Sequence, residues 1–223
     1  MPPAGVYTKG IMKSTLVFDF DGTIADTLHH LVDISNTLSE EFNFKFIAPD
    51  DLEILQDKTT REVIQHLGVP MMKIPVIVAK AKKLLHEQMN RIQPIEGLKD
   101  ILWELKEARF QLGILSSNSS ENVKKFLTRH GLTMFDFIET TSKIWTKNTS
   151  LNRLIKHHQL DTNKTVYIGD ETRDIEAAKR SGIKIAAVTW GYNSGKTLQS
   201  YDPDYLLNAP TDLIRIFKNN HHA

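Results

Sequence analysis

The sequence contains no cysteine among its 223 residues. This excludes disulfide bonds, a thiol nucleophile and a zinc site built on cysteine, and it gives no support for secretion. A run of about 18 apolar residues is also missing, so we expect no membrane-spanning helix. The residues before Thr15 lack the long apolar stretch of a signal peptide. We therefore expect a cytoplasmic protein without a membrane partner.

A strong charge of one sign is absent as well. The 28 lysines and arginines face 27 aspartates and glutamates, which leaves a net charge of +1 at pH 7. Because no strong overall field recruits nucleic acid, we expect no nucleic-acid partner. The composition that is present, 40% hydrophobic and 25% charged, is that of an ordinary globular protein.

Short apolar segments alternate with helical patterns over much of the chain. They occupy residues 15–18, 110–115, 135–138, 165–168 and 183–188, and a sixth short strand is expected at 205–207. Apolar residues at helical spacing lie between them, for example over residues 98–108 and 174–181. Almost wholly apolar strands are typical of a parallel sheet that is buried on both faces. The alternation predicts an α/β fold with a doubly wound, Rossmann-like parallel sheet.

Residues 24–93 interrupt this alternation. They show helical patterns near residues 28–38, 61–67 and 76–89 and no convincing β-rich run. We predict that they form an α-helical cap inserted directly after the first strand. The α/β core would then comprise residues 1–23 and 94–223.

Polar residues stand at the ends of the predicted strands. They are Asp19, Asp21 and Gly22 after the first strand, Ser117 and Asn118 after the second, Lys147 before the helix that follows the third, and Asp170 and Asp174 after the fourth. Open parallel sheets bind ligands beyond the carboxyl ends of their strands, so we expect these residues to converge. Clustered carboxylates repel one another, and a hard cation such as Mg²⁺ relieves that repulsion.

This set of side chains suits phosphoryl transfer. A carboxylate can accept a phosphoryl group covalently, and Mg²⁺ steers a phosphate toward it. A second acid two residues on, Asp21, can protonate a leaving oxygen and later activate water. Ser117 and Lys147 offer a hydroxyl and a cation to the phosphoryl oxygens, and Gly22 permits a sharp turn of the backbone close to them.

The sequence resembles the haloacid dehalogenase-like superfamily of phosphatases, and within it the phosphoglycolate-phosphatase-like members. The resemblance covers residues 15 to about 208 and rests on four motifs. These are Val17-Phe18-Asp19-Phe20-Asp21-Gly22-Thr23, Leu115-Ser116-Ser117-Asn118, Lys147, and Tyr167-Ile168-Gly169-Asp170-Glu171-Thr172-Arg173-Asp174.

The resemblance implies a role for each motif residue. Asp19 would be the nucleophile that becomes an aspartyl phosphate, and Asp21 the general acid and base. Asp19, the main-chain carbonyl of Asp21 and Asp170 would hold Mg²⁺, with Asp174 in support. Ser117, Asn118, Lys147 and Gly22 would form the phosphate site. The implied activity is Mg²⁺-dependent hydrolysis of a small phosphorylated metabolite, such as 2-phosphoglycolate, selected by the cap.

The third motif and the cap residues leave alternatives open. Many relatives carry Lys-Pro at the third motif, where this chain has Lys147-Asn148, and Lys143 is a rival. We prefer Lys147 because it opens the next predicted helix. In the cap, Lys58 and Arg61 are cations that could meet a substrate carboxylate, although a solvated surface position is the stronger interpretation of each.

Two other functions remain compatible with these motifs. A phosphomutase of the β-phosphoglucomutase type shares the cap and the motifs, and a non-catalytic phosphate-binding relative would keep the site without turnover. A dehalogenase is disfavoured because it does not need the second acid, Asp21. The monomer and the homodimer both remain open.

Two further patterns are interpreted as having no function. The segment Gly191-Tyr192-Asn193-Ser194-Gly195-Lys196-Thr197 resembles a phosphate-binding P-loop, but it has three residues between its glycines instead of four, and we predict a loop. The histidines, including the pair His157-His158, show no metal-ligand spacing with a partner acid and are predicted to be surface residues.

Overall fold

The computed structural model of the chain describes residues 14–141 and 147–218. Its strands form one parallel six-stranded sheet in the order β3-β2-β1-β4-β5-β6. The strands are β1 (Thr15–Phe18), β2 (Gln111–Ser116), β3 (Phe137–Thr140), β4 (Thr165–Gly169), β5 (Lys184–Val188) and β6 (Tyr205–Leu207). This order is that of a doubly wound sheet, whose strand order reverses beside β1. The predicted α/β fold is confirmed, including the short sixth strand.

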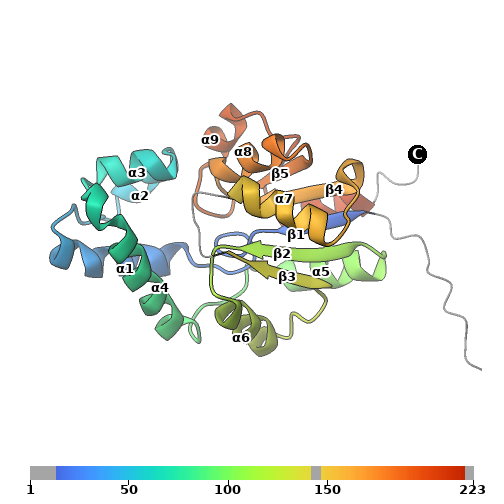
Figure 1. Cartoon of the computed structure of the whole chain (residues 1–223), viewed down its shortest axis with the longest axis horizontal. Helices are drawn as coiled ribbons and strands as arrows, with labels where there is room; N and C mark the ends of the chain where they lie inside the picture. Colours follow the sequence, from blue (N-terminus) through green and yellow to red (C-terminus); the bar gives the residue numbers. More distant parts are fainter. Residues whose placement is uncertain (1–13, 142–146, 219–223) are drawn as a thin grey trace, which may run out of the picture.

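Helices cover both faces of the sheet (Figure 1). One face carries α5 (Leu98–Glu107), α6 (Ser120–His130), α10 (Thr211–Leu213) and the π-helical turn η4 (Ile214–Lys218). The other face carries α7 (Lys147–His157), α8 (Thr172–Arg180) and α9 (Gly195–Ser200), while the 3₁₀ turn η3 (Thr162–Lys164) leads into β4. Within β1, Leu16 and Phe18 belong to the first core and Val17 to the second. Burial on both faces explains why these strands are almost wholly apolar.

Several strand boundaries differ from the prediction by one or two residues, and one predicted loop contains a helix. The third strand begins at Phe137, two residues after its predicted start. Phe135 instead packs edge-on against Phe18 with the ring centroids 6.1 Å apart, and the Asp136 carboxylate accepts a hydrogen bond of 2.8 Å from the Leu112 N–H. The segment predicted as a loop after β5 contains α9, because the Ser194 hydroxyl caps this helix by accepting from the Thr197 N–H.

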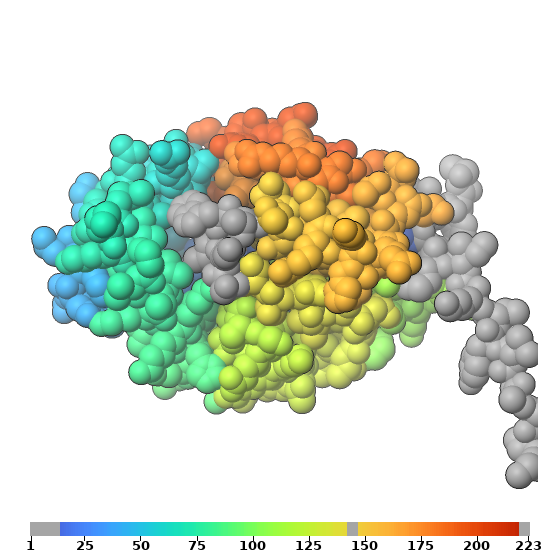
Figure 2. Space-filling model, viewed as in Figure 1, coloured from blue at the N-terminus to red at the C-terminus, as the bar shows by residue number. Residues whose placement is uncertain are grey.

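The cap consists of α1 (Leu28–Phe42), α2 (Asp51–Gln56), α3 (Thr60–His66), the 3₁₀ turn η1 (Met71–Lys73) and α4 (Ile74–Gln88). These helices gather beside the carboxyl ends of the strands and form a lobe of their own (Figures 1 and 2). The chain leaves and re-enters the core along paired segments, since Asp26 N–H donates to Gln93 and Ala25 forms an antiparallel bridge with Pro94. The predicted limits of the cap, residues 24 and 93, stay a prediction.

The helix α2 was not among the predicted elements. It is six residues long, too short for a clear apolar period, and the Asp51 carboxylate stabilises the turn before it by accepting from the Ala48 N–H at 3.0 Å. Within the part of the chain that the structure describes, no helix is both long enough and apolar enough to cross a membrane.

Candidate active site

Three aspartates meet where β1 and β4 end. Asp19 directly follows β1, Asp170 directly follows β4, and Asp174 lies in the first turn of α8. One carboxylate oxygen of each lies within 4.8 Å of the others, and all three side chains are buried. β1 and β4 are hydrogen-bonded neighbours, so the two strand ends bring their acids together as expected.

Lys147 is the buried cation of this cluster. Its Nζ forms ion pairs with the carboxylates of Asp19 and Asp174. Burial alone would lower the pKa of Lys147, but the charges of Asp174 and Asp19 outweigh it and raise that pKa well above its ordinary value. The lysine therefore stays charged, and it opens α7 as predicted. The rival Lys143 lies outside the described residues.

Three glycines make room for the acids. A Cβ atom on Gly22 or Gly191 would lie 2.2 or 2.3 Å from Asp170 Oδ2, and one on Gly169 would lie 2.4 Å from Asp174 Oδ2. Gly22 also has a φ of +79°, a conformation that side chains disfavour. The tight turn expected at Gly22 is therefore present. The group that approaches Gly22 closely in this structure is the carboxylate of Asp170.

Asp170 is held by residues outside the predicted set. The Thr23 hydroxyl donates a hydrogen bond of 2.7 Å to Oδ1, and the Tyr192 N–H donates one of 2.8 Å to Oδ2. Tyr192 belongs to the segment that resembles a P-loop, which thus supports an acid. Burial first, and then the charges of Glu171 and Asp174, raise the pKa of Asp170 well above its ordinary value.

The three carboxylates fit a hard divalent cation. Burial also raises the pKa of Asp174, to about 6, although Lys147 acts in the opposite direction. The nearby cations Lys147 and Arg173 therefore offset only part of the cost of burying the charges of Asp170 and Asp174. Mg²⁺ prefers oxygen ligands, and its charge would relieve the remaining repulsion. The donor set of Asp19, Asp170 and Asp174 therefore suits the Mg²⁺ that the resemblance implies.

Asp21 lies beside this cluster and is oriented by Asn118. The Asn118 amide donates to both Asp21 carboxylate oxygens at 3.2 Å, and Asn122 in turn donates to the Asn118 side-chain oxygen at 2.8 Å. Burial, followed by the charge of Asp19, raises the pKa of Asp21 to about 7. A carboxyl group that holds a proton near neutral pH can pass it to a leaving oxygen. In this structure Asn118, which we predicted at the phosphate, contacts Asp21.

A cavity of about 370 Å³ lies between the cap and the acidic end of the core. Asp21, Ser117 and Asn118 line its core end, and the cap contributes Lys58 and Lys82. Arg61 does not line this cavity. It lines a second hollow, together with Lys147 and Asn148. The structure therefore separates the two cap cations that the sequence suggested.

Several hydrogen bonds tie the cap to the core at this cavity. Lys82 of α4 donates a hydrogen bond of 2.8 Å to the Ser117 carbonyl. The Thr60 hydroxyl donates at 2.9 Å to Glu171, which also pairs with Arg173. Asn193 donates to the carbonyl of Lys58 at 2.8 Å. Lys82 is absent from the predicted site residues, although one signal exists, since it interrupts the apolar helix face formed by Val78, Ala81 and Leu85.

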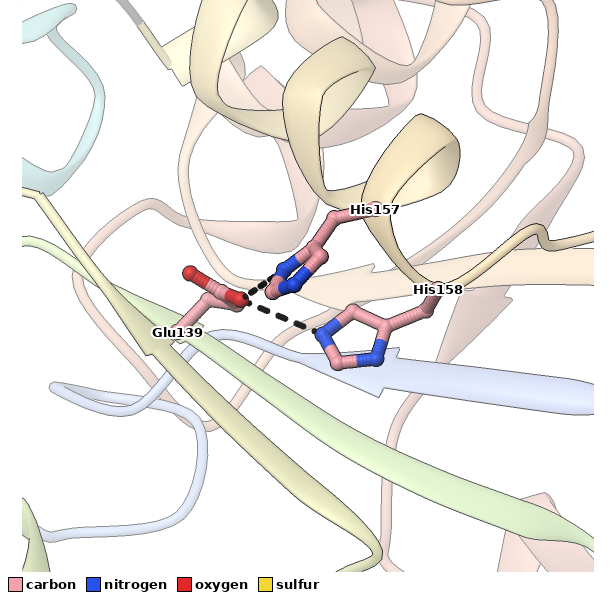
Figure 3. A group of neighbouring side chains, drawn as sticks. All are labelled: Glu139, His157 and His158. Atoms are coloured by element: carbon pink, nitrogen blue, oxygen red, sulfur yellow. Dashed lines mark hydrogen bonds and ion pairs between the residues drawn. The ribbon is translucent and has the colours of Figure 1, made fainter.

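A second group of potential metal ligands lies on the surface. Glu139 Oε1 is 2.8 Å from His157 Nδ1 and 3.2 Å from His158 Nε2 (Figure 3). The prediction that these histidines lack a partner acid is wrong, because β3 brings Glu139 to them from 18 residues away in the sequence. Two imidazoles and a carboxylate at these distances could hold a metal ion.

Comparison with known proteins identifies the family. The model of the haloacid dehalogenase-like hydrolase family matches residues 16–188. This chain belongs to that family. The predicted membership and the predicted enzyme class, a hydrolase of the phosphatase type, are confirmed.

Individual members of the haloacid dehalogenase-like family match nearly the whole chain. The phosphoglycolate phosphatase of Synechococcus elongatus is 33% identical over 201 residues, which cover 90% of this chain and 95% of that protein. The pyrophosphatase PpaX of Bacillus velezensis is 25% identical and covers 91% and 95%. A solved haloacid dehalogenase-like hydrolase from Streptococcus pneumoniae, 20% identical, has a TM-score of 0.76 over 92% of this chain and 98% of that one. This last likeness supports the fold.

Proposed function

We propose that this chain is a Mg²⁺-dependent phosphomonoester phosphatase that works through an aspartyl phosphate on Asp19. The observation that carries the proposal is one buried cluster that holds Asp19, Lys147, Asp170 and Asp174, with Asp21 beside it at the end of a cavity. The name of the Synechococcus relative, phosphoglycolate phosphatase, supports phosphate-ester chemistry.

The first step forms a bond between a carboxylate oxygen of Asp19 and phosphorus. The bond from phosphorus to the leaving oxygen breaks, and Asp21 gives its proton to that oxygen, so an alcohol departs. One oxygen of Asp19 is already fixed by the Phe20 N–H at 2.8 Å, which limits the side chain's freedom. Lys147, which touches Asp19, would hold a phosphoryl oxygen as negative charge develops.

The second step returns the enzyme to its starting state. Asp21, now a carboxylate, takes a proton from water while the water oxygen attacks phosphorus. The bond between Asp19 and phosphorus breaks, and inorganic phosphate leaves. Asn118 keeps Asp21 in place through both steps by its two hydrogen bonds. Mg²⁺, when bound to Asp19, Asp170 and Asp174, would supply positive charge against the phosphoryl oxygens.

The names of the relatives make 2-phosphoglycolate the first substrate to test. Its carboxylate could meet Lys58, which lines the cavity together with Asp21. The cap would close over the bound ester and exclude bulk water from the acyl phosphate. A phosphomutase would need the aspartyl phosphate to resist hydrolysis until the phosphoryl group is transferred. No contact in the described residues favours this alternative.

The test is phosphate release from a panel of phosphomonoesters, with Mg²⁺ and with EDTA, combined with acid quenching during turnover. We expect release that requires Mg²⁺, and a trapped acyl phosphate on the peptide that contains Asp19. Transfer of the phosphoryl group to a second sugar phosphate without phosphate release would favour the mutase. A trapped phosphate on any other residue would overturn the assignment of the nucleophile.

A further inference from the structure

The cavity beside Asp21 has two unlike ends. Its charged lining residues, Asp21, Lys58, Lys82, Glu171 and Arg173, belong to the core or lie on cap segments that are hydrogen-bonded to it. Most of the remaining wall is apolar and comes from all four cap helices and the residues that join them. Its apolar members are Leu28, Leu31, Val32, Ile47, Leu52, Leu55, Val63, Ile64, Leu67, Val78, Ala81 and Leu85.

We propose that the leaving group of the natural substrate is hydrophobic, an alkyl or aryl alcohol whose hydrocarbon part lies against this apolar wall. The inference rests on the proposed phosphatase function, because it takes the phosphoryl group to be at Asp19 and Asp21. Asp21 lines the cavity together with residues of α1, α2, α3 and α4, so an ester whose leaving oxygen lies at Asp21 would place its hydrocarbon part among these helices.

The size and polarity of the cavity argue against a two-carbon acid as the best substrate. A volume of about 370 Å³ lies in the range of sites that enclose whole metabolites. A glycolate group, whose carboxylate could meet Lys58, would leave most of the apolar wall in contact with water. A hydrophobic group would instead displace that water and gain by burial. Specificity would thus differ from that named for the Synechococcus relative, at 33% identity.

The experiment compares kcat/KM along a series of straight-chain alkyl phosphates and phenyl phosphate with that for 2-phosphoglycolate. Full burial of a methylene group corresponds to about a fourfold gain, so we expect kcat/KM to rise about two- to fourfold per methylene until the cavity is filled. A flat or falling series with 2-phosphoglycolate as the best substrate would overturn the proposal. Failure to hydrolyse any ester would instead count against the phosphatase function itself.

Variants of the wall sharpen this test. Val63 of α3 and Val78 of α4 line the cavity, and Val63→Thr combined with Val78→Thr introduces hydroxyls with little change of shape. We expect the double variant to lose at least half of the gain per methylene. Val76→Thr, at an exposed position on the same helix as Val78, should keep the full gain. An equal gain in kcat/KM per methylene in the double variant and in Val76→Thr would contradict the proposal. Should the double variant fail to fold, the wild-type series alone decides.

An independent observation points to a second ligand site, at the surface. We infer that Glu139, His157 and His158 bind a divalent transition metal such as Zn²⁺. Imidazole nitrogens with a carboxylate oxygen form a donor set that Zn²⁺ favours. The donor separations of 2.8 and 3.2 Å approach the distance of about 3.3 Å between ligands of one tetrahedral zinc. His158 is also held in place, since it stacks on Phe137 with centroids 4.1 Å apart.

The position of this group allows a metal to enter. His157 has 68% of its side chain exposed, whereas the side chains of His158 and Glu139 are mostly covered, so His157 can adjust to a metal that the other two residues bind. A metal would take the place of the hydrogen bonds that join Glu139 to the two histidines.

Zinc binding is measured by competition with a chromophoric chelator in an Asp170→Asn variant. This substitution removes one ligand of the acidic cluster, so that zinc bound there does not add to the measured number of zinc ions per chain. We expect one zinc to bind, and at least tenfold weaker binding after Glu139→Gln or after His157→Gln with His158→Gln. His29→Gln, at an exposed histidine of the cap, should bind zinc as the Asp170→Asn variant does. The same affinity and stoichiometry in all of these variants would overturn the inference.

Discussion

The core and the cap contribute to the cavity in different ways. The core contributes Asp21 and Asn118, which lie beside a buried cluster at the strand ends where Lys147 contacts Asp19. At the cap end, the wall consists of apolar side chains such as Val63 and Val78, most of them on helices joined to the core by a few hydrogen bonds. The sheet thus places the chemistry rigidly, while the cap can vary to suit a substrate.

The largest effect is expected at the core end, from Asp19→Asn. An amide is a poor nucleophile, so phosphate release should fall at least about a thousandfold. The fold should persist, because asparagine can still accept the hydrogen bond from the Phe20 N–H. Phosphate release and circular dichroism measure the two effects. Activity within tenfold of the wild type would show that another residue is the nucleophile.

The second prediction concerns the metal and the same acids. A Mg²⁺ concentration of a hundred times Kd stabilises a protein by about 2.7 kcal/mol, which corresponds to about 5–10 °C in Tm for a chain of this size. We expect this increase in the wild type and its loss in Asp170→Asn. The matched control is Asp33→Asn, an exposed acid of the cap, which should retain the increase. An unchanged increase in Asp170→Asn would place the metal elsewhere.

The core end could be predicted from the sequence far better than the cap. Asp19 and Asp170 directly follow apolar runs, so finding the strands also locates the acids. The residues that hold them come from distant segments, as with Thr23, which lies 147 residues from Asp170. No local pattern reports such a pairing. For the same reason the partner of His157 and the role of Tyr192 became apparent only in the folded chain.

The cap could be predicted as helical, but its contacts could not. Lys58 and Arg61 are close in sequence, yet they line different hollows because α3 begins between them. Lys82 reaches the core, whereas Lys83, the next residue of the same helix, is exposed. Which side chains of a cap helix face the core depends on how the helix packs. The sequence pattern of a small cap does not determine that packing.

The third prediction tests whether the tie between α4 and the core matters. Lys82→Met removes the hydrogen bond to the Ser117 carbonyl and a cation from the cavity. A hydrogen bond from a charged group contributes about 1.5–3 kcal/mol, so we expect kcat/KM to fall about tenfold or more. Lys83→Met changes the exposed neighbouring lysine and should have little effect. Equal kinetics for both variants would mean that Lys82 plays no part in closure.

The smallest effect is expected in the cap, at the start of α3. Glu62 accepts hydrogen bonds of 2.8 Å from the backbone and the hydroxyl of Thr59, and these, the backbone bond first, lower its pKa. A carboxylate whose pKa is lowered by folding stabilises the protein above its unfolded pKa, and this stabilisation is lost as the pH falls through the folded value. Thermal unfolding of Glu62→Ala should therefore show a slightly lower Tm than the wild type near pH 7, and the difference should shrink as the pH falls below the ordinary pKa of a glutamate. Glu62→Gln, which can keep the cap without titrating, should remove most of that pH dependence. This cap begins α3, the helix that carries Val63 and Ile64 of the apolar wall. A difference in Tm between Glu62→Ala and the wild type that grew on acidification would contradict the stabilising role given to Glu62.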